Sequence, residues 1–200
     1  MRRVLSLVIA VGMLALMVGP VSAKPTLTPT ALAPLSGFEW SHVNAINNQG
    51  VAVGFSGAGP YTATMWDRLG NPTALAPLVP DVYNSAEDIN DRGVIVGYSG
   101  STATIWDSPD SPRALDLPED ITADSSKAFG INSRGDVVGT VFPSSGPHFA
   151  LAVVWKSSGD IVVLDSYDPA LSDSYAYAIN DRGVVVGRST WNNGNVGSAT

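Results

Sequence analysis

The sequence predicts an all-β protein built as a tandem array of four-stranded antiparallel units, most consistent with a β-propeller of about four blades whose last blade is incomplete. A nine-residue signature recurs four times, at intervals of 43, 42 and 48 residues. A segment ending in tryptophan follows the signature, and a leucine lies nine residues after each of three tryptophans. Units of just over forty residues with four short strands are typical of propeller blades. An open β-solenoid-like array of the same units is the alternative.

Each signature predicts a β-hairpin. The pattern Ile-Asn-x-x-Gly opens it, in repeats that start near residues 44, 87, 129 and 177. The asparagine side chain caps a type I turn, and the glycine supplies the left-handed residue after it. The predicted turn residues are Asn47, Gly50, Asn90, Gly93, Asn132, Gly135, Asn180 and Gly183. The valine-rich stretch after each turn lacks polar alternation, which indicates a strand covered on both faces by neighbouring sheets.

Two further strands complete each unit. The third strand is predicted at residues 63–67, 103–107 and 152–156, each with its tryptophan near the end, and the fourth copy begins at 199–200. The leucine strand follows after a short turn. Since no stretch after the first residues shows a sustained helical period, four antiparallel strands account for each unit.

The segment 29–35 is a copy of the leucine strand with no unit in front of it. It is identical in sequence to residues 72–78, whereas the fourth unit lacks this strand. We therefore expect residues 29–35 to act as a closing strand in the same sheet as residues 184–186. Such closure would remove two exposed sheet edges, which otherwise invite aggregation.

The first 23 residues have the pattern of a secretory signal peptide. Arg2 and Arg3 give a basic start, residues 5–18 are apolar, and residues 21–23 are small or uncharged, as at cleavage sites. The apolar run is shorter than the ~20 residues that a membrane-spanning helix needs. The repeat domain is therefore expected to span residues 24–200, without a membrane anchor, in a secreted, periplasmic or cell-envelope protein.

Composition narrows the classes of partner. Removal of Arg2 and Arg3 leaves 9 basic residues against 18 acidic ones. Because phosphate binding relies on Lys and Arg, a nucleic acid is not expected as a partner. The chain has no cysteine, which excludes disulfides, a thiol nucleophile and thiolate metal ligands. The sequence defines no oligomeric state.

The repeats resemble those of the HAF family of extracellular repeat proteins, which is named after a His-Ala-Phe tripeptide. The Ile-Asn-x-x-Gly-x-x-Val-Gly signature, the strand ending in tryptophan and the leucine strand carry the resemblance across residues 29–200. The naming tripeptide differs here, as in Thr-Ala-Thr at residues 62–64. The resemblance implies an exported repeat protein of propeller type, from a family without an established activity. Since members often carry more repeats, the chain is expected to be a fragment or a truncated array.

The sequence predicts no catalytic residues, metal site or cofactor. His42 and His148 lie in different units and lack a metal-binding spacing. Residues 88–93 have some likeness to a calcium loop, and calcium remains an alternative there, although Arg92 occupies a ligand position.

Loop lengths vary on one face of the array. The spacing from the last glycine of the signature to the tryptophan is 12, then 9, then 16 residues, whereas the Asn-x-x-Gly turn is constant. Alternate turns of an up-and-down sheet lie on opposite faces, so the variable loops share one face, and such faces often bind ligands. The candidate ligand-binding residues there are Phe55, Tyr61, Tyr98, Phe142, His148, Phe149, Trp191, Asn192 and Asn193.

These patterns favour a non-catalytic binding or interaction module, with a glycan or a protein as its ligand. Aromatic side chains beside asparagine and glycine suit both. The alternative is a propeller-type carbohydrate-active enzyme, a glycosidase or lyase, which would need paired carboxyl groups. Glutamate occurs only at positions 39, 87 and 119, which favours the binding module. A purely structural surface repeat is the third hypothesis.

Overall fold

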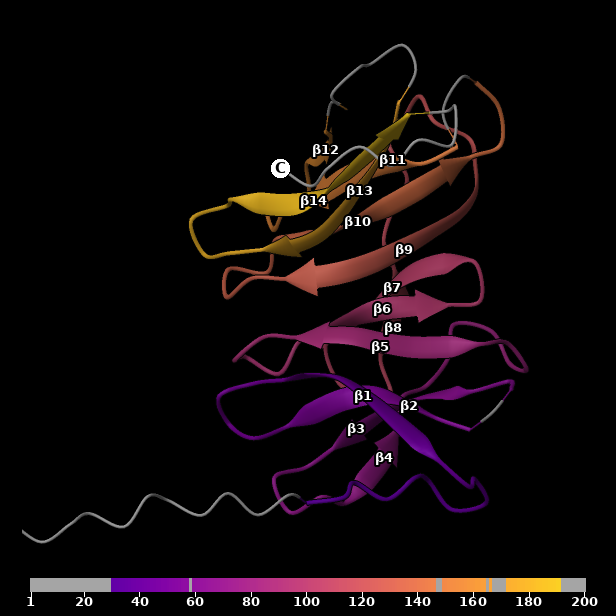
Figure 1. The fold of residues 1–200 in the computed structure, drawn as a ribbon, viewed down its shortest axis with the longest axis vertical. Helices are drawn as coiled ribbons and strands as arrows, with labels where there is room; N and C mark the ends of the chain where they lie inside the picture. The colour runs from indigo at the N-terminus through magenta and orange to yellow at the C-terminus, as the bar shows by residue number, and fades with distance from the viewer. Residues whose placement is uncertain (1–29, 58, 147–148, 165, 167–171, 192–200) are drawn as a thin grey trace, which may run out of the picture. The chain divides into compact units, whose positions relative to one another are not determined.

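The computed structural model describes residues 30–57, 59–146, 149–164, 166 and 172–191, and their strands form four antiparallel sheets (Figure 1). Three sheets have four strands each, in the order of the chain, and the last has two. The prediction of a tandem array of four-stranded antiparallel sheets is therefore confirmed. Among the described residues there is no helix long and apolar enough to cross a membrane.

The strands follow the repeats closely. The first sheet contains β1 (Ser41–Ile46), β2 (Ala52–Ser56), β3 (Thr62–Trp66) and β4 (Pro72–Ala74). The second contains β5 (Asn84–Ile89), β6 (Ile95–Ser99), β7 (Thr102–Trp106) and β8 (Pro112–Ala114). The third contains β9 (Ala123–Ile131), β10 (Val137–Pro143), β11 (Leu151–Trp155) and β12 (Ile161–Val163). The fourth contains β13 (Ser172–Ile179) and β14 (Val185–Trp191).

The turn inside the signature has one geometry in all four units. In the second unit, the amide of Gly93 donates to the carbonyl of Asn90 at 3.0 Å. The Asn90 Oδ1 accepts from the amides of Arg92 and Val94 at 3.0 and 3.1 Å. Glycine is needed because φ is 81° at Gly93, in the left-handed region. The equivalent φ values are 79° at Gly50, 93° at Gly135 and 82° at Gly183.

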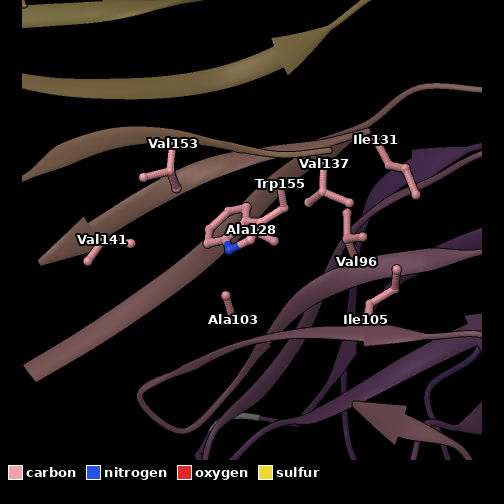
Figure 2. Close-up of a cluster of buried hydrophobic side chains, with 9 residues drawn as sticks. All are labelled: Val96, Ala103, Ile105, Ala128, Ile131, Val137, Val141, Val153 and Trp155. Atoms are coloured by element: carbon pink, nitrogen blue, oxygen red, sulfur yellow. The ribbon is translucent and has the colours of Figure 1, made fainter. Parts of the chain in front are cut away.

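Consecutive sheets pack face to face, and equivalent positions are buried at each junction. Between the second and third sheets, Val96 and Ile105 form one cluster with Ile131, Val137 and Trp155 (Figure 2). The valine before the last glycine of the signature faces the next sheet, whereas the isoleucine and the tryptophan face the preceding one. These junctions remove apolar surface from water, which stabilises the array by about 25 cal/mol per Å² buried.

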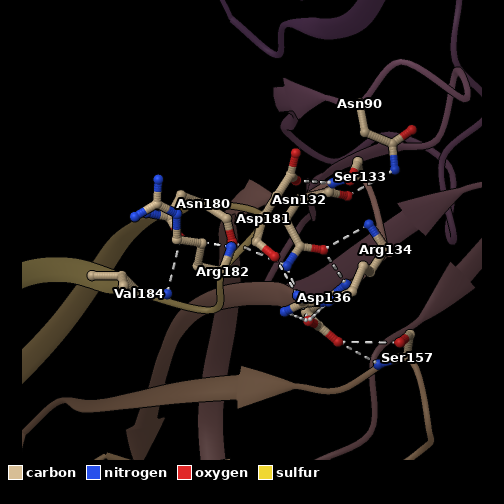
Figure 3. A network of polar contacts seen from close by, with 10 residues as sticks. All are labelled: Asn90, Asn132, Ser133, Arg134, Asp136, Ser157, Asn180, Asp181, Arg182 and Val184. Carbon is tan, nitrogen blue, oxygen red and sulfur yellow. Dashed lines mark hydrogen bonds and ion pairs between the residues drawn. The ribbon is translucent and has the colours of Figure 1, made fainter.

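A ladder of asparagine side chains joins the turns of neighbouring sheets on one face of the array. The Nδ2 of Asn47 donates to the carbonyl of Asn90 at 3.2 Å, and that of Asn90 donates to the carbonyl of Asn132 at 3.1 Å. The Nδ2 of Asn132 donates in turn to the carbonyl of Asn180 at 3.3 Å (Figure 3). The asparagine of the signature therefore has two roles, since it caps its own turn and bonds to the next sheet.

The segment 31–35 lies against the first sheet, which corrects the predicted pairing with the last one. It forms no strand, and its Ala33 carbonyl accepts from Trp66 Nε1 at 2.7 Å. The amide of Leu35 donates to Ser56 Oγ at 3.1 Å. Among the described residues the last sheet has only β13 and β14. The copied sequence determines which surface of a unit the segment fits. Docking on the nearest such surface along the chain closes the shortest loop and therefore costs the least conformational entropy.

Asp88, in the segment with a likeness to a calcium loop, uses its carboxylate to join two sheets. Its Oδ1 accepts from the amide of Ile89, and its Oδ2 accepts from the amide of Ile131 in the next sheet, both at 2.9 Å. Burial raises the pKa of Asp88, and the two hydrogen bonds act against that rise. Within the described ranges no three His, Cys, Asp or Glu side chains are grouped to hold a metal ion.

Candidate functional site

Six aromatic side chains gather at the first two sheets. We call this set the aromatic cluster, and its members are Trp40, His42, Phe55, Tyr61, Tyr83 and Tyr98. Phe55 lies at its centre, with ring centroids 5.5 Å from Trp40, 5.3 Å from His42 and 4.5 Å from Tyr61. Tyr61 continues the cluster to Tyr83, at 4.8 Å. Such offset and edge-on contacts are the favoured geometries of aromatic pairs.

Strand register and loop position explain why these rings meet. The pairing of β1 with β2 places His42 opposite Phe55, and the two rings stack at an interplanar angle of 28°. Tyr61 lies in the connection just before β3, and Tyr83 lies just before β5. The cluster is therefore assembled from one cross-strand pair and two of the connections that vary in length between units.

Tyr98 extends the cluster into the second and third sheets. The hydroxyl groups of Tyr61 and Tyr98 lie 2.7 Å apart and form a hydrogen bond. The Nζ of Lys127, on β9, lies 4.3 Å from the centroid of the Tyr98 ring, a cation–π contact. Burial, with the hydrogen bond from Tyr61 as a smaller cause, raises the pKa of Tyr98 well above its usual range. Tyr98 therefore stays a neutral phenol at physiological pH.

The cluster has accessible edges and a half-buried floor. Trp40, His42 and Tyr83 are exposed, whereas Phe55 and Tyr61 are half-buried. Exposed rings that are held in place by their neighbours lose little conformational entropy when a ligand packs on them. The cluster therefore provides a fixed aromatic surface rather than a set of independent side chains.

A cavity of about 520 Å³ lies next to the cluster, since the connections that carry Tyr61 and Tyr83 also line it. Its apolar wall includes Phe38 and Leu75, and its polar groups are Asp81, Asp110 and Asn84. Asn84 is only 4% exposed, and its Nδ2 donates to the carbonyl of Val82 at 2.7 Å. In the part of the chain that the structure describes, its Oδ1 has no hydrogen-bond donor. A buried acceptor without a donor costs free energy, but this oxygen has almost no surface open to the cavity.

A second hollow, of about 340 Å³, follows the asparagine ladder and is lined by the same turn positions of all four units. Its polar groups already bond between sheets. Asp91 accepts from the amide of Asn48 at 2.9 Å, and Asp181 accepts from the amide of Ser133 at 2.9 Å. These hydrogen bonds lower the pKa of both carboxyl groups. Because its groups hold the array together, this hollow is the weaker candidate.

The structure brings together only some of the residues predicted for the variable face. Three of them do not lie in loops as predicted, since Phe55, Tyr98 and Phe142 belong to the strands β2, β6 and β10. Phe55, Tyr61 and Tyr98 lie in the aromatic cluster, whereas Phe142 packs on Tyr175 in the last two sheets, at 6.4 Å. Phe149 is exposed. Of the others, His148, Asn192 and Asn193 lie outside the described residues, and Trp191 is the last residue of β14.

The sequence-based prediction missed Trp40, His42 and Tyr83. Tyr83 lies in a connection of variable length, so the signal that selected Tyr61 applied to it too. His42 and Trp40 belong to the region before the first signature, and their proximity to Phe55 depends on the register of β1 and β2. Only a prediction of cross-strand partners could have found them.

The fold and this site define a tandem-repeat all-β protein with a fixed aromatic surface at its first two sheets. In comparisons with known proteins, no family model and no curated protein matches the chain. Its function is therefore inferred from the geometry of the site.

Proposed function

We propose that this protein is an exported, non-catalytic binding module that holds a glycan against the aromatic cluster. The observation that carries the proposal is the fixed aromatic surface, with exposed Trp40 and Tyr83, beside a cavity whose lining includes the carboxylates of Asp81 and Asp110. The C–H face of a sugar ring packs on aromatic rings, while its hydroxyl groups donate to carboxylate and amide oxygens. Asp81 and Asp110 supply carboxylate oxygens of this kind.

A glycan fits this site better than a protein ligand does. The cavity volume of about 520 Å³ lies within the range of about 300–1,000 Å³ that is usual for small-ligand sites. Specific protein partners usually need about 800 Å² of buried surface on each side. The acidic balance of the chain, 18 acidic against 11 basic residues, weighs against a nucleic acid as the ligand.

We also propose that the sheets are blades of a propeller-type array, related to the HAF repeats, rather than turns of a β-solenoid. Four antiparallel strands follow one another within a sheet, as in a blade. The first strands β1, β5, β9 and β13 adjoin one another from sheet to sheet, as strands around a common axis do. A crystal structure in which these strands do not follow a common axis would contradict this proposal.

Replacement of Tyr83 by alanine is expected to weaken glycan binding at least about tenfold, which corresponds to about 1.4 kcal/mol. Tyr83 is 51% exposed and contacts Tyr61 in a T-shaped arrangement, so its loss should remove contact area without unfolding the sheet. A glycan array would identify the ligand, and isothermal titration calorimetry would measure the affinity of each variant.

The matched control is Leu69→Ala, which removes an exposed apolar side chain from the turn between β3 and β4. It should leave the affinity unchanged. Equal losses in both variants, or no glycan bound by the unsubstituted protein, would contradict the proposed function. Release of shortened or unsaturated sugars from the bound glycan would instead support the glycosidase or lyase alternative.

Export provides an independent expectation. We propose cleavage after Ala23, because small residues precede that bond and an apolar stretch lies before it. Intact-mass measurement of the protein secreted by a bacterial host should give a chain that starts at Lys24. A secreted chain that retains Met1 would show that this segment is not a cleaved signal.

A further inference from the structure

Every junction between sheets buries the same pair of surfaces. The isoleucine of the signature lies on the side of a sheet that faces the preceding sheet, and Ile89 is 5% exposed there. The last valine of the signature lies on the opposite side, facing the next sheet, and Val96 is 0% exposed. Each sheet therefore has two different faces, and each junction joins one of each kind.

The first and last sheets each leave at least part of one of these faces uncovered among the described residues. Ile46, the equivalent of Ile89, is 68% exposed on the first sheet, and we call this face the head. Val186, the equivalent of Val96, is 51% exposed on the last sheet, and Val184 beside it is also exposed. We call that face the tail. Head and tail are the two halves of the junction that the chain forms three times internally.

The segment 31–35 already completes part of a junction on the head. Trp66 donates to the Ala33 carbonyl at 2.7 Å, just as Trp106 donates to the Ala76 carbonyl at 2.7 Å. The amide of Leu35 bonds to Ser56, as that of Leu78 bonds to Ser99. Leu78 belongs to the chain that leaves the outer strand of the preceding sheet. On the head, segment 31–35 therefore takes the place of the connection from a preceding sheet, although the described residues contain no sheet before the first.

The asparagine ladder also makes the head complementary to the tail. It runs through Asn47, Asn90, Asn132 and Asn180. In each step the side chain of one asparagine donates to the backbone carbonyl of the next. A tail docked on a head would place Asn180 next to Asn47, in the relation that Asn47 has to Asn90.

We propose that a second copy of this chain docks its head on the tail of the first, by the packing that joins the sheets within one copy. The interface is heterologous, because head and tail are different surfaces. Two copies joined at both junctions form a closed ring, and copies joined at one junction form an open chain. This association is independent of the proposed glycan site, which lies at the first two sheets, on the cross-strand pair His42–Phe55 and on the connections that carry Tyr61 and Tyr83.

Sedimentation velocity with the mature protein tests the proposal through Ile46→Lys on the head and Val186→Asp on the tail. The unsubstituted protein is expected to associate reversibly in the micromolar range, as a dimer or as longer chains. Each variant alone should be monomeric, since a charge cannot be buried in this apolar junction. The control Leu69→Lys, which adds a charge at an exposed turn, should associate as the unsubstituted protein does.

Mixing the two variants gives the decisive result. Ile46→Lys keeps an intact tail and Val186→Asp keeps an intact head, so an equimolar mixture should form a one-to-one dimer through a single junction. Unchanged melting temperatures would show that both variants are folded. A monomeric unsubstituted protein would overturn the proposal. So would an oligomer that only one of the two variants disrupts, because that pattern indicates a symmetric contact between identical faces.

Discussion

Gly97→Ala is expected to destabilise the protein by about 3 kcal/mol or more, because the added methyl group would overlap backbone atoms. Gly97 is the last residue of its signature, on β6. A Cβ built there falls on the carbonyl oxygen of Ser85 and within 3.0 Å of the Ala86 Cα. Backbone atoms of a paired strand cannot move aside as a flexible side chain can, so the second sheet must open or distort.

The matched control lies four residues earlier in the same hairpin. Gly93 has φ 81°, and a Cβ added there meets nothing within 4 Å. Gly93→Ala should therefore cost only about 1 kcal/mol, and the β-branched Gly93→Val about 1–2 kcal/mol, through backbone strain alone. Urea unfolding of the three variants measures the differences in unfolding free energy. Equal costs at positions 93 and 97 would show that the close approach does not constrain the fold.

This close approach recurs in every unit, and the sequence alone did not reveal its cause. At Gly54, Gly139 and Gly187 an added Cβ likewise falls on a carbonyl oxygen of the first strand of the same hairpin. A register shift lies beside each contact, as between Ala86 and Asp88 in the second unit. The repeated glycine was visible in the sequence, but an irregularity in pairing depends on two strands at once.

Local and repeated features of the fold were predictable, whereas the partner of a copied segment was not. The Asn-x-x-Gly turn is set by residues within five positions of one another, so the hairpins could be derived from the sequence. The identity of residues 29–35 and 72–78 indicated that the two segments fit equivalent surfaces. Three sheets carry the equivalent tryptophan, Trp66, Trp106 and Trp155, and the segment docks on the first of them, through Trp66 and Ser56.

The candidate site was likewise predictable from the sequence only in part. Variation in loop length pointed to Phe55, Tyr61 and Tyr98, and the structure places these three in one cluster, although Phe55 and Tyr98 lie in strands and not in loops. His42 joins them only because it lies opposite Phe55 in the register of β1 and β2. Loop length reports where a chain tolerates insertion, whereas the stacking of rings depends on which strand positions are opposite each other.

Asp136 is a buried carboxylate at a position where the other three signatures have valine. Its Oδ2 accepts from Asn132 Nδ2 at 3.0 Å and from Arg134 at 2.8 Å (Figure 3). Its Oδ1 accepts from the amide and the hydroxyl of Ser157, both at 3.1 Å. Burial alone would raise the pKa of Asp136, but these hydrogen bonds together outweigh it and hold the pKa far below its usual range.

Asp136→Asn is therefore expected to lower the unfolding free energy by about 3 kcal/mol at pH 7, because the new amide group would face donors that the carboxylate now satisfies. The control Asp107→Asn breaks an ion pair with Arg113 whose side chains are 52% and 60% exposed, and should cost less than about 1 kcal/mol.

The dependence on pH distinguishes loss of this charge from a change in packing. A carboxyl group whose pKa is lower in the folded than in the unfolded state stabilises the protein above the unfolded pKa, which is about 3.9 for aspartate. That contribution is lost as the pH falls from about 4 towards the folded pKa of Asp136. The difference in unfolding free energy between the unsubstituted protein and Asp136→Asn should therefore be constant near neutral pH and shrink below about pH 4. A difference that stays constant down to acid pH would show that Asp136 acts through its shape and not through its charge.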